Sequence, residues 1–302
     1  MFGSNSLLVE REMRVRTVLV FLFFLIFIWQ ISLIIFNIRE VLIGIEITKN
    51  ELEFNRDNKS TTIPRLIHQM WKTTDLSSYP INNSNSRWKL FYPTYRIQLW
   101  TDKEIDELFQ LKHSKDLYLV YQSYFYAIQR SDLARLVILY HYGGIYADLD
   151  VFPSYDNIED FILRNVSFVI GRSSNDNCLV NHFLISEQSS PILRYILNRI
   201  EIKSVLQRIY FLPYLEVFST GSIFLTKTIR QRMQHVYSQS DRLVILSKQR
   251  LSRYISHRVG RSWHLFDGFI LNFIVEHPFQ FLSCLFFIFL ILFFMKKKRF
   301  FI

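Results

Sequence analysis

The sequence predicts an α/β fold in which a mostly parallel sheet is flanked by helices. Three observations indicate this class. Strand-like and helix-like segments alternate through the middle of the chain, a Gly-Gly pair stops the longest helical pattern, and a short apolar strand follows that pair directly. Such alternation is typical of a largely parallel sheet. Two uncharged apolar stretches, one near each end of the chain, frame this region.

The elements are predicted from periodicity and from the residues that begin and end each segment. Strands are predicted at residues 65–71, 96–100, 145–152 and 167–171. Helices are predicted at residues 102–111 and 116–142, the first of them beginning at a Thr101-Asp102 cap. Gly143 and Gly144 end the second helix, because glycine tolerates the left-handed conformation of a helix C-terminus.

The two apolar stretches predict transmembrane helices. Residues 17–36 are about as long as a helix needs to cross a ~30 Å hydrocarbon layer, and residues 279–295 are at the short end of the range. A cleaved signal peptide is the alternative for the first, but its apolar run is long and no small-residue cleavage site follows. A buried core helix is the alternative for the second, but a basic cluster, Lys296 to Arg299, follows it as at a cytosolic membrane face.

Lysine and arginine near both stretches predict that the two tails are cytosolic and that the region between them is lumenal. Three glycosylation sequons, beginning at Asn58, Asn82 and Asn165, agree with this orientation. The predicted organisation is a cytosolic tail (1–16), a transmembrane helix (17–36), a stem (37–62), a globular domain (63–275), a transmembrane helix (279–295) and a basic cytosolic tail (296–302).

Charge and cysteine content exclude two classes of protein. The net charge is +10, but four of the positive charges lie in the C-terminal cluster and no Lys/Arg-rich run lies in the interior. An anionic membrane surface or a phosphate-bearing substrate accounts for this charge better than nucleic acid does. Of the two cysteines, Cys284 lies in the second apolar stretch, so Cys178 is alone and no intrachain disulfide is expected.

The candidate chemistry lies in residues 131–152, SDLARLVILYHYGGIYADLDVF. Side chains alternate along a strand, so Asp148 and Asp150 are predicted to point the same way and Leu149 into the core. Two close carboxylates repel unless a cation or proton lies between them, and Mn²⁺ or Mg²⁺ takes oxygen ligands from carboxylates and phosphates together. A lone Asp-x-Asp is more often a solvated turn, but the preceding helix and Gly-Gly pair favour a metal and diphosphate site.

This segment resembles the signature of glycosyltransferase family 32, the sugar transferases with a DXD motif, and most closely its inositol phosphoceramide mannosyltransferases. Further blocks resemble the same family in the same order, so the resemblance covers residues 63–267. These blocks are IPRLIHQMWK (63–72), WTD (100–102), NHFLIS (181–186), TGSIFLT (220–226) and HRVGRSWH (257–264).

The resemblance implies a GT-A fold, a nucleotide-sugar donor, a divalent cation (Mn²⁺ or Mg²⁺) and transfer with retention of anomeric configuration. Asp148 and Asp150 would bind metal, diphosphate and ribose, and His264 would be a further metal ligand. His257 would reach the metal or the leaving diphosphate from the C-terminal side. The residues implied to bind the donor are His68, Trp71, Asp132, Arg135, Tyr146, Asn181 and Trp263.

Purely structural roles remain open as alternatives for some of these residues. Asp132 and Arg135 are three apart on one helical face and are also consistent with a local salt bridge, and His68 with a buried core histidine. The chain also departs from the family pattern at His182, at Ser190 and Ile192 on either side of Pro191, and at Ser222, where contacts to acceptor and donor sugar are expected. These departures bear on substrate identity more than on the reaction class.

The function predicted from the resemblance is transfer of mannose from GDP-mannose to a lipid head group such as inositol phosphoceramide, in the lumen of the Golgi or endoplasmic reticulum. Two anchors would hold the site close to the bilayer, which suits a lipid acceptor, and a regulatory membrane subunit is a further expected partner. Three alternatives stay open: transfer of mannose, galactose or GlcNAc to protein-linked glycans, an inactive lumenal domain that binds sugar nucleotides, and a metal-dependent phosphohydrolase.

Overall fold

The computed structural model describes residues 14–16, 18–19, 21–22, 25, 63–79, 83–112, 115–162, 166–173, 178–200, 220–235, 242–258, 280 and 283. Among these residues, no helix is both long enough and apolar enough to span a bilayer. The helices predicted at 17–36 and 279–295 lie mostly outside the described residues, and the predicted stem lies wholly outside them. These three segments therefore stay predictions.

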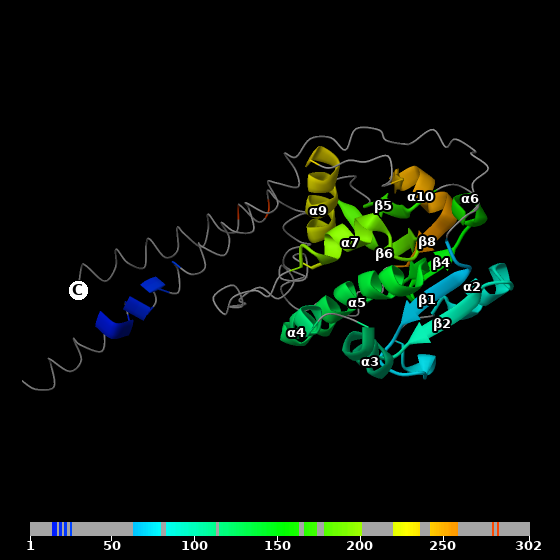
Figure 1. Ribbon diagram of the computed structural model, residues 1–302. Coiled ribbons are helices and arrows are strands. Elements are labelled where there is room, and N and C mark those ends of the chain that lie inside the picture. Colours follow the sequence, from blue (N-terminus) through cyan, green and yellow to red (C-terminus); the bar gives the residue numbers. More distant parts are fainter. Residues whose placement is uncertain are drawn as a thin grey trace, which may run out of the picture.

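The core of the globular domain is a mixed six-stranded sheet with the strand order β2-β1-β3-β6-β5-β7 (Figure 1). β1 is parallel to β2 and β3, and β5 is parallel to β7, whereas β6 runs antiparallel to both of its neighbours. The sheet is thus mostly parallel, as predicted, with one reversed strand. The bounds are β1 Leu66–Met70, β2 Arg96–Trp100, β3 Gly144–Ala147, β5 Phe168–Arg172, β6 Leu179–Ser186 and β7 Leu243–Leu246.

Helices cover both faces of the sheet. β6 shows why: Leu184 packs into one hydrophobic cluster, whereas its neighbours Phe183 and Ile185 pack into another on the opposite face. The first face is covered by α3 (Asp102–Lys112), α4 (Lys115–Ser123), α5 (Ala127–Tyr142), α7 (Pro191–Leu197) and α9 (Ser222–His235). The second is covered by α2 (Asn85–Phe91), α6 (Glu159–Ile162) and α10 (Lys248–Tyr254).

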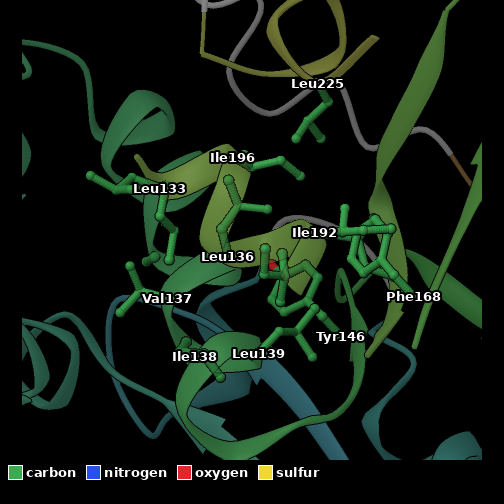
Figure 2. Close-up of a cluster of buried hydrophobic side chains, with 14 of the residues drawn as sticks. Leu133, Leu136, Val137, Ile138, Leu139, Tyr146, Phe168, Ile192, Ile196 and Leu225 are labelled. Carbon is green, nitrogen blue, oxygen red and sulfur yellow. The ribbon is translucent and has the colours of Figure 1, made fainter. Parts of the chain in front are cut away.

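Helix α5 is the centre of the first cluster (Figure 2). Its residues from Leu133 to Leu139 are all buried, and Leu136 and Leu139 lie on the side toward Ile192 of α7 and Tyr146 of β3. The single helix predicted at 116–142 is wrong in one respect, because the chain breaks between α4 and α5. Tyr126 is extended, and its backbone N–H donates to Oε1 of Gln129 at 3.2 Å, so α5 has its own start.

The end of α5 is where the predicted glycines act. Gly143 and Gly144 have φ angles of +61° and +95°, which side chains other than glycine rarely adopt. A Cβ on Gly144 would lie 2.6 Å from the Leu66 carbonyl oxygen, so only glycine lets β3 begin this close to β1. The helix therefore turns directly into the strand that leads to the acidic pair.

The strand predicted at 145–152 is interrupted in the structure. β3 ends at Ala147, and β4 (Val151–Pro153) belongs to a separate two-stranded sheet with β8 (Ile255–His257). Asp148 to Asp150 form the turn between the two strands, closed by a 2.9 Å hydrogen bond from the Val151 N–H to the Asp148 carbonyl oxygen. The prediction failed because the partner of β4 comes about a hundred residues later in the chain, beyond any local pattern.

Candidate active site

The acidic turn at residues 148–150 lies at the carboxyl end of β3 and is held from three sides by backbone hydrogen bonds. The Asp148 N–H donates to the His182 carbonyl oxygen of β6 at 2.9 Å, and the Arg258 N–H donates to the Asp150 carbonyl oxygen at 2.9 Å. Ser84, at the start of α2, donates its N–H to the Leu149 carbonyl oxygen at 2.7 Å. Leu149 is 2% exposed, so its predicted burial is confirmed.

Asp148 is fixed by two buried side chains. The Tyr146 hydroxyl donates to its Oδ1 at 2.6 Å, and Nη1 of Arg135 donates to its Oδ2 at 3.4 Å. Burial raises the pKa of Asp148, the positive charge of Arg135 opposes this, and the negative charge of Asp150 adds to it; the net pKa is raised. The two carboxylates thus repel each other electrostatically, although they lie in a turn and not in a strand as predicted. A cation placed between them would relieve this repulsion.

Behind Asp148, the Asp132–Arg135 pair is part of a wider buried network. Both side chains are 3% exposed, and Nη2 of Arg135 lies 3.2 Å from Oδ1 of Asp132. Asn181 Nδ2 donates to Oδ1 of Asp132 at 2.8 Å, and Thr220 Oγ1 donates to its Oδ2 at 2.9 Å. Burial nevertheless raises the pKa of Asp132 to about 6. The pair is more than a local helix salt bridge, because Arg135 joins Asp132 to Asp148 and to the Asn181 carbonyl oxygen, 2.8 Å away.

Asp150 meets a histidine from the C-terminal part of the domain. The pairing of β4 with β8 places Nε2 of His257 3.3 Å from Oδ2 of Asp150. Burial opposes protonation of His257, but the hydrogen bond and charge of Asp150 outweigh it, so the pKa of His257 is raised. His182 stacks on His257 with ring centroids 4.1 Å apart. His182, where the chain departs from the family pattern, thus packs beside the acidic turn.

The aromatic residues after β1 approach the same turn. Trp71 donates its indole N–H to Ser78 Oγ at 2.8 Å, and Tyr79 lies edge-on to its ring at 4.7 Å between centroids. Burial raises the pKa of the Tyr79 hydroxyl, and the charges of Asp150 and Asp148 raise it further. Tyr79 therefore connects the indole to the two carboxylates.

His68 has the environment of a core histidine. It is 1% exposed, its Nδ1 accepts the indole N–H of Trp100 at 3.1 Å, and its Nε2 lies 2.9 Å from the Gly143 carbonyl oxygen. Both ring nitrogens are therefore used within the protein, with the proton on Nε2. The structure favours the alternative that this residue ties β1 to β2 and to the end of α5.

Acidification is expected to destabilise the domain through His68. Burial lowers its pKa from 6.5 to about 4, so the folded state holds the neutral ring and the unfolded state takes up the proton first. The stabilisation is complete above pH 6.5 and is lost as the pH falls toward 4, an effect of about 3 kcal/mol. Denaturant unfolding of the detergent-solubilised chain across this range measures it. His68→Gln, which keeps a donor and an acceptor, should make the dependence shallower, while His182, whose pKa burial lowers to about 3, keeps part of it. An unchanged slope would contradict the assignment.

The structure brings together most of the predicted site residues. Tyr146, Asn181, Asp132 and Arg135 converge on Asp148, whereas Trp263 and His264 lie outside the described residues, so their roles stay predictions. Sequence reasoning missed Tyr79 and Thr220. Thr220 stands in a block that resembles the family, which is a usable signal, but nothing local to Tyr79 indicated that it approaches the turn.

The described residues of the acidic turn offer two carboxylates to a divalent cation. Within the part of the chain that the structure describes, no group of three or more His, Cys, Asp or Glu side chains is arranged to hold a metal ion. Asp148 and Asp150 supply two carboxylates, and Mg²⁺ is commonly bound by one or two carboxylates plus substrate phosphates. The residues present therefore suit a cation shared with a diphosphate.

A mostly parallel α/β sheet that ends in a paired-aspartate turn, with a buried Asp–Arg pair behind it, suits a ligand that carries a diphosphate. Residues 80–169 match a family profile described as glycosyltransferase sugar-binding region containing DXD motif. Inositol phosphoceramide mannosyltransferase 1 of Schizosaccharomyces pombe is 30% identical over 247 residues, which are 78% of this chain and 75% of the relative. The chain belongs to this DXD glycosyltransferase family.

Other relatives are similar over part of their length. Inositol phosphoceramide mannosyltransferase 3 of S. pombe is 34% identical over 170 residues, 56% of this chain and 45% of the relative. Mannosyl phosphorylinositol ceramide synthase SUR1 of Saccharomyces cerevisiae is 28% identical over 246 residues, 79% of this chain and 60% of the relative. The chain thus spans less than two thirds of these two proteins.

Proposed function

We propose that this chain is a metal-dependent, retaining hexosyltransferase of GT-A fold that moves mannose from GDP-mannose to the head group of inositol phosphoceramide. The observation that carries the proposal is the acidic turn, where Asp148 and Asp150 lie at the carboxyl edge of the sheet beside the buried Asp132–Arg135 pair. Ligands of open α/β sheets bind at this edge. Mannose and the lipid acceptor are taken from the names of the relatives.

The side chains around the turn have distinct parts to play in this reaction. A bound Mn²⁺ or Mg²⁺ would neutralise the charge that develops on the departing diphosphate. Arg135 and Tyr146 hold both oxygens of Asp148, so the carboxylate is oriented before the donor binds. A carboxylate has about four acceptor positions, so Asp132 keeps room for a sugar hydroxyl.

A buried amide adds a further polar group on the same helix. Gln129 lies one turn before Asp132 and is 1% exposed, and among the described residues its Nε2 has no hydrogen-bond partner. A buried donor left without a partner costs about 1–3 kcal/mol. A donor-sugar hydroxyl at this end of α5 would satisfy it, which supports a polar ligand beside Asp132.

The proposed reaction takes place in the lumen of the Golgi or endoplasmic reticulum. It rests on the expected transmembrane helices at residues 17–36 and 279–295, which would place the domain beside its lipid acceptor. A regulatory membrane subunit would be an additional partner in that setting.

A panel of labelled donors tests the proposal. The detergent-solubilised chain is incubated with GDP-mannose, UDP-galactose or UDP-GlcNAc and with Mn²⁺, and either inositol phosphoceramide or a glycoprotein is added. We expect label in the lipid with GDP-mannose alone, and only when Mn²⁺ and lipid are both present. Donor consumption without an acceptor would indicate a hydrolase, and label confined to the glycoprotein would move the acceptor to protein-linked glycans; either result contradicts the proposal.

A further inference from the structure

Asp102 and Trp71 follow neighbouring strands at the carboxyl edge of the sheet. β1 and β2 are parallel neighbours in register, with Met70 opposite Trp100. The Trp71 N–H continues this ladder by donating to the Trp100 carbonyl oxygen at 3.0 Å. The residues that follow the two strands, Trp71-Lys72 and Thr101-Asp102, therefore leave the sheet side by side.

The indole of Trp71 is held in place by its neighbours, and a lysine lies over its ring. Its N–H is bonded to Ser78 and its edge is packed by Tyr79, while the Lys72 ammonium lies 5.5 Å from the ring centroid. The charges of both carboxylates of the acidic turn raise the pKa of the Tyr79 hydroxyl. A nucleotide whose diphosphate is at that turn would thus bring its base to Trp71 and Lys72.

Asp102 is not used to cap the helix that it begins. Thr101 and Glu104 form the cap of α3, because Oε2 of Glu104 accepts the Thr101 N–H at 2.7 Å and the Thr101 hydroxyl at 2.8 Å. Among the described residues the Asp102 carboxylate accepts no hydrogen bond within 3.5 Å. The Asp102 side chain is exposed at this edge. Partial burial raises its pKa, and the positive charges of Arg130 and Lys72 oppose that shift.

We propose that Asp102 selects the base of the nucleotide and that the base it selects is guanine. Guanine presents two adjacent donors, N1–H and the N2 amino group, which match the two oxygens of a carboxylate, and its O6 acceptor matches the ammonium of Lys72. Uracil presents one N–H between two carbonyl oxygens, so a carboxylate accepts only one hydrogen bond from it. Trp71 offers a stacking face to the ring. The inference rests on the proposed nucleotide-sugar donor and adds the residue that fixes its base.

Affinities of the free diphosphates test this inference. Dissociation constants of GDP and UDP are measured with Mn²⁺ on the detergent-solubilised full chain and on Asp102→Asn. The wild type should bind GDP more tightly than UDP. Since a bidentate contact to a base contributes about 1–3 kcal/mol of discrimination, the variant should lose roughly 10- to 100-fold of that preference. An asparagine can donate to one uracil carbonyl and accept its N–H, so UDP affinity should hold or improve.

The matched control is Asp116→Asn, which removes an exposed acid from the first turn of α4 just as the test variant does from α3. It should leave the ratio of the two constants unchanged. A ratio that also stays unchanged in Asp102→Asn would overturn the inference and leave the proposed reaction standing. A wild type that prefers UDP would overturn the GDP-sugar donor itself, and the inference with it. The ratio reports base selectivity, so a variant that is merely less stable does not imitate the expected result.

Discussion

Asp150→Asn is expected to lower acceptor-dependent sugar transfer about 10³-fold, because the variant keeps the shape of the side chain and removes the charge that a cation shared with the diphosphate needs. The backbone bonds that hold the turn come from peptide groups of residues 84, 182 and 258, which the substitution leaves in place. Thermal unfolding should therefore change little. Initial rates at saturating donor over a Mn²⁺ series, together with melting curves, separate a chemical defect from a structural one.

A control for this prediction is Asp156→Asn. Asp156 also pairs with a basic side chain, Arg253, at 2.8 Å, but the arginine is 68% exposed, and the pair lies after β4, away from the turn. This variant should retain wild-type transfer. If Asp150→Asn kept its rate within tenfold and its dependence on Mn²⁺, the acidic turn would not be the centre of the reaction.

Arg135→Met is expected to destabilise the protein by about 3–5 kcal/mol, since it leaves Asp132 and Asp148 without their shared guanidinium. The cost follows from burial: the arginine and Asp132 are each 3% exposed, so water cannot replace the lost contacts. The melting temperature should fall by about 10 °C, and transfer should fall as well, because Asp148 loses one of the two groups that orient it.

A double substitution identifies the cause. Asp132→Asn added to Arg135→Met removes one of the uncompensated carboxylates, so the double variant should recover part of the lost stability. Arg253→Met, at the exposed pair with Asp156, should change stability by no more than about 1 kcal/mol. Additive losses in the double variant would show that the Asp132–Arg135 contact carries little energy.

Elements defined by local signals could be predicted from the sequence. The strand at residues 96–100 is observed with the predicted bounds, and α5 ends at Gly143 as predicted, because alternation, capping and glycine conformation act over a few residues. Elements that depend on distant partners could not be. The strand after Gly144 breaks because β4 pairs with β8, and the helix predicted from residue 116 breaks because Gln129 caps a new start at Tyr126.

The residues of the candidate site also divide into those that the sequence could predict and those that it could not. Asp132, Arg135 and Tyr146 were predicted from a motif that resembles a family, and the structure places all three in contact with one another or with Asp148. The same resemblance offered His68 as a donor-binding residue, yet the Trp100 indole N–H and the Gly143 carbonyl oxygen occupy its ring. Periodicity shows that a residue is inward-facing, but only the packed neighbours show whether its polar atoms are left over for a ligand.

The pairing of β4 with β8 has a consequence for the order of assembly. Strands β1 to β6 and helix α5 are complete once the ribosome has synthesised about two thirds of the chain, but the two groups that contact Asp150, the imidazole of His257 and the N–H of Arg258, come later. During synthesis the hydrophobic scaffold can therefore form first, and the acidic turn closes only after β8 has been synthesised. A nascent chain that lacks residues 255–258 would hold the hydrophobic scaffold without the closed acidic turn, so closure of the turn is tied to synthesis of β8.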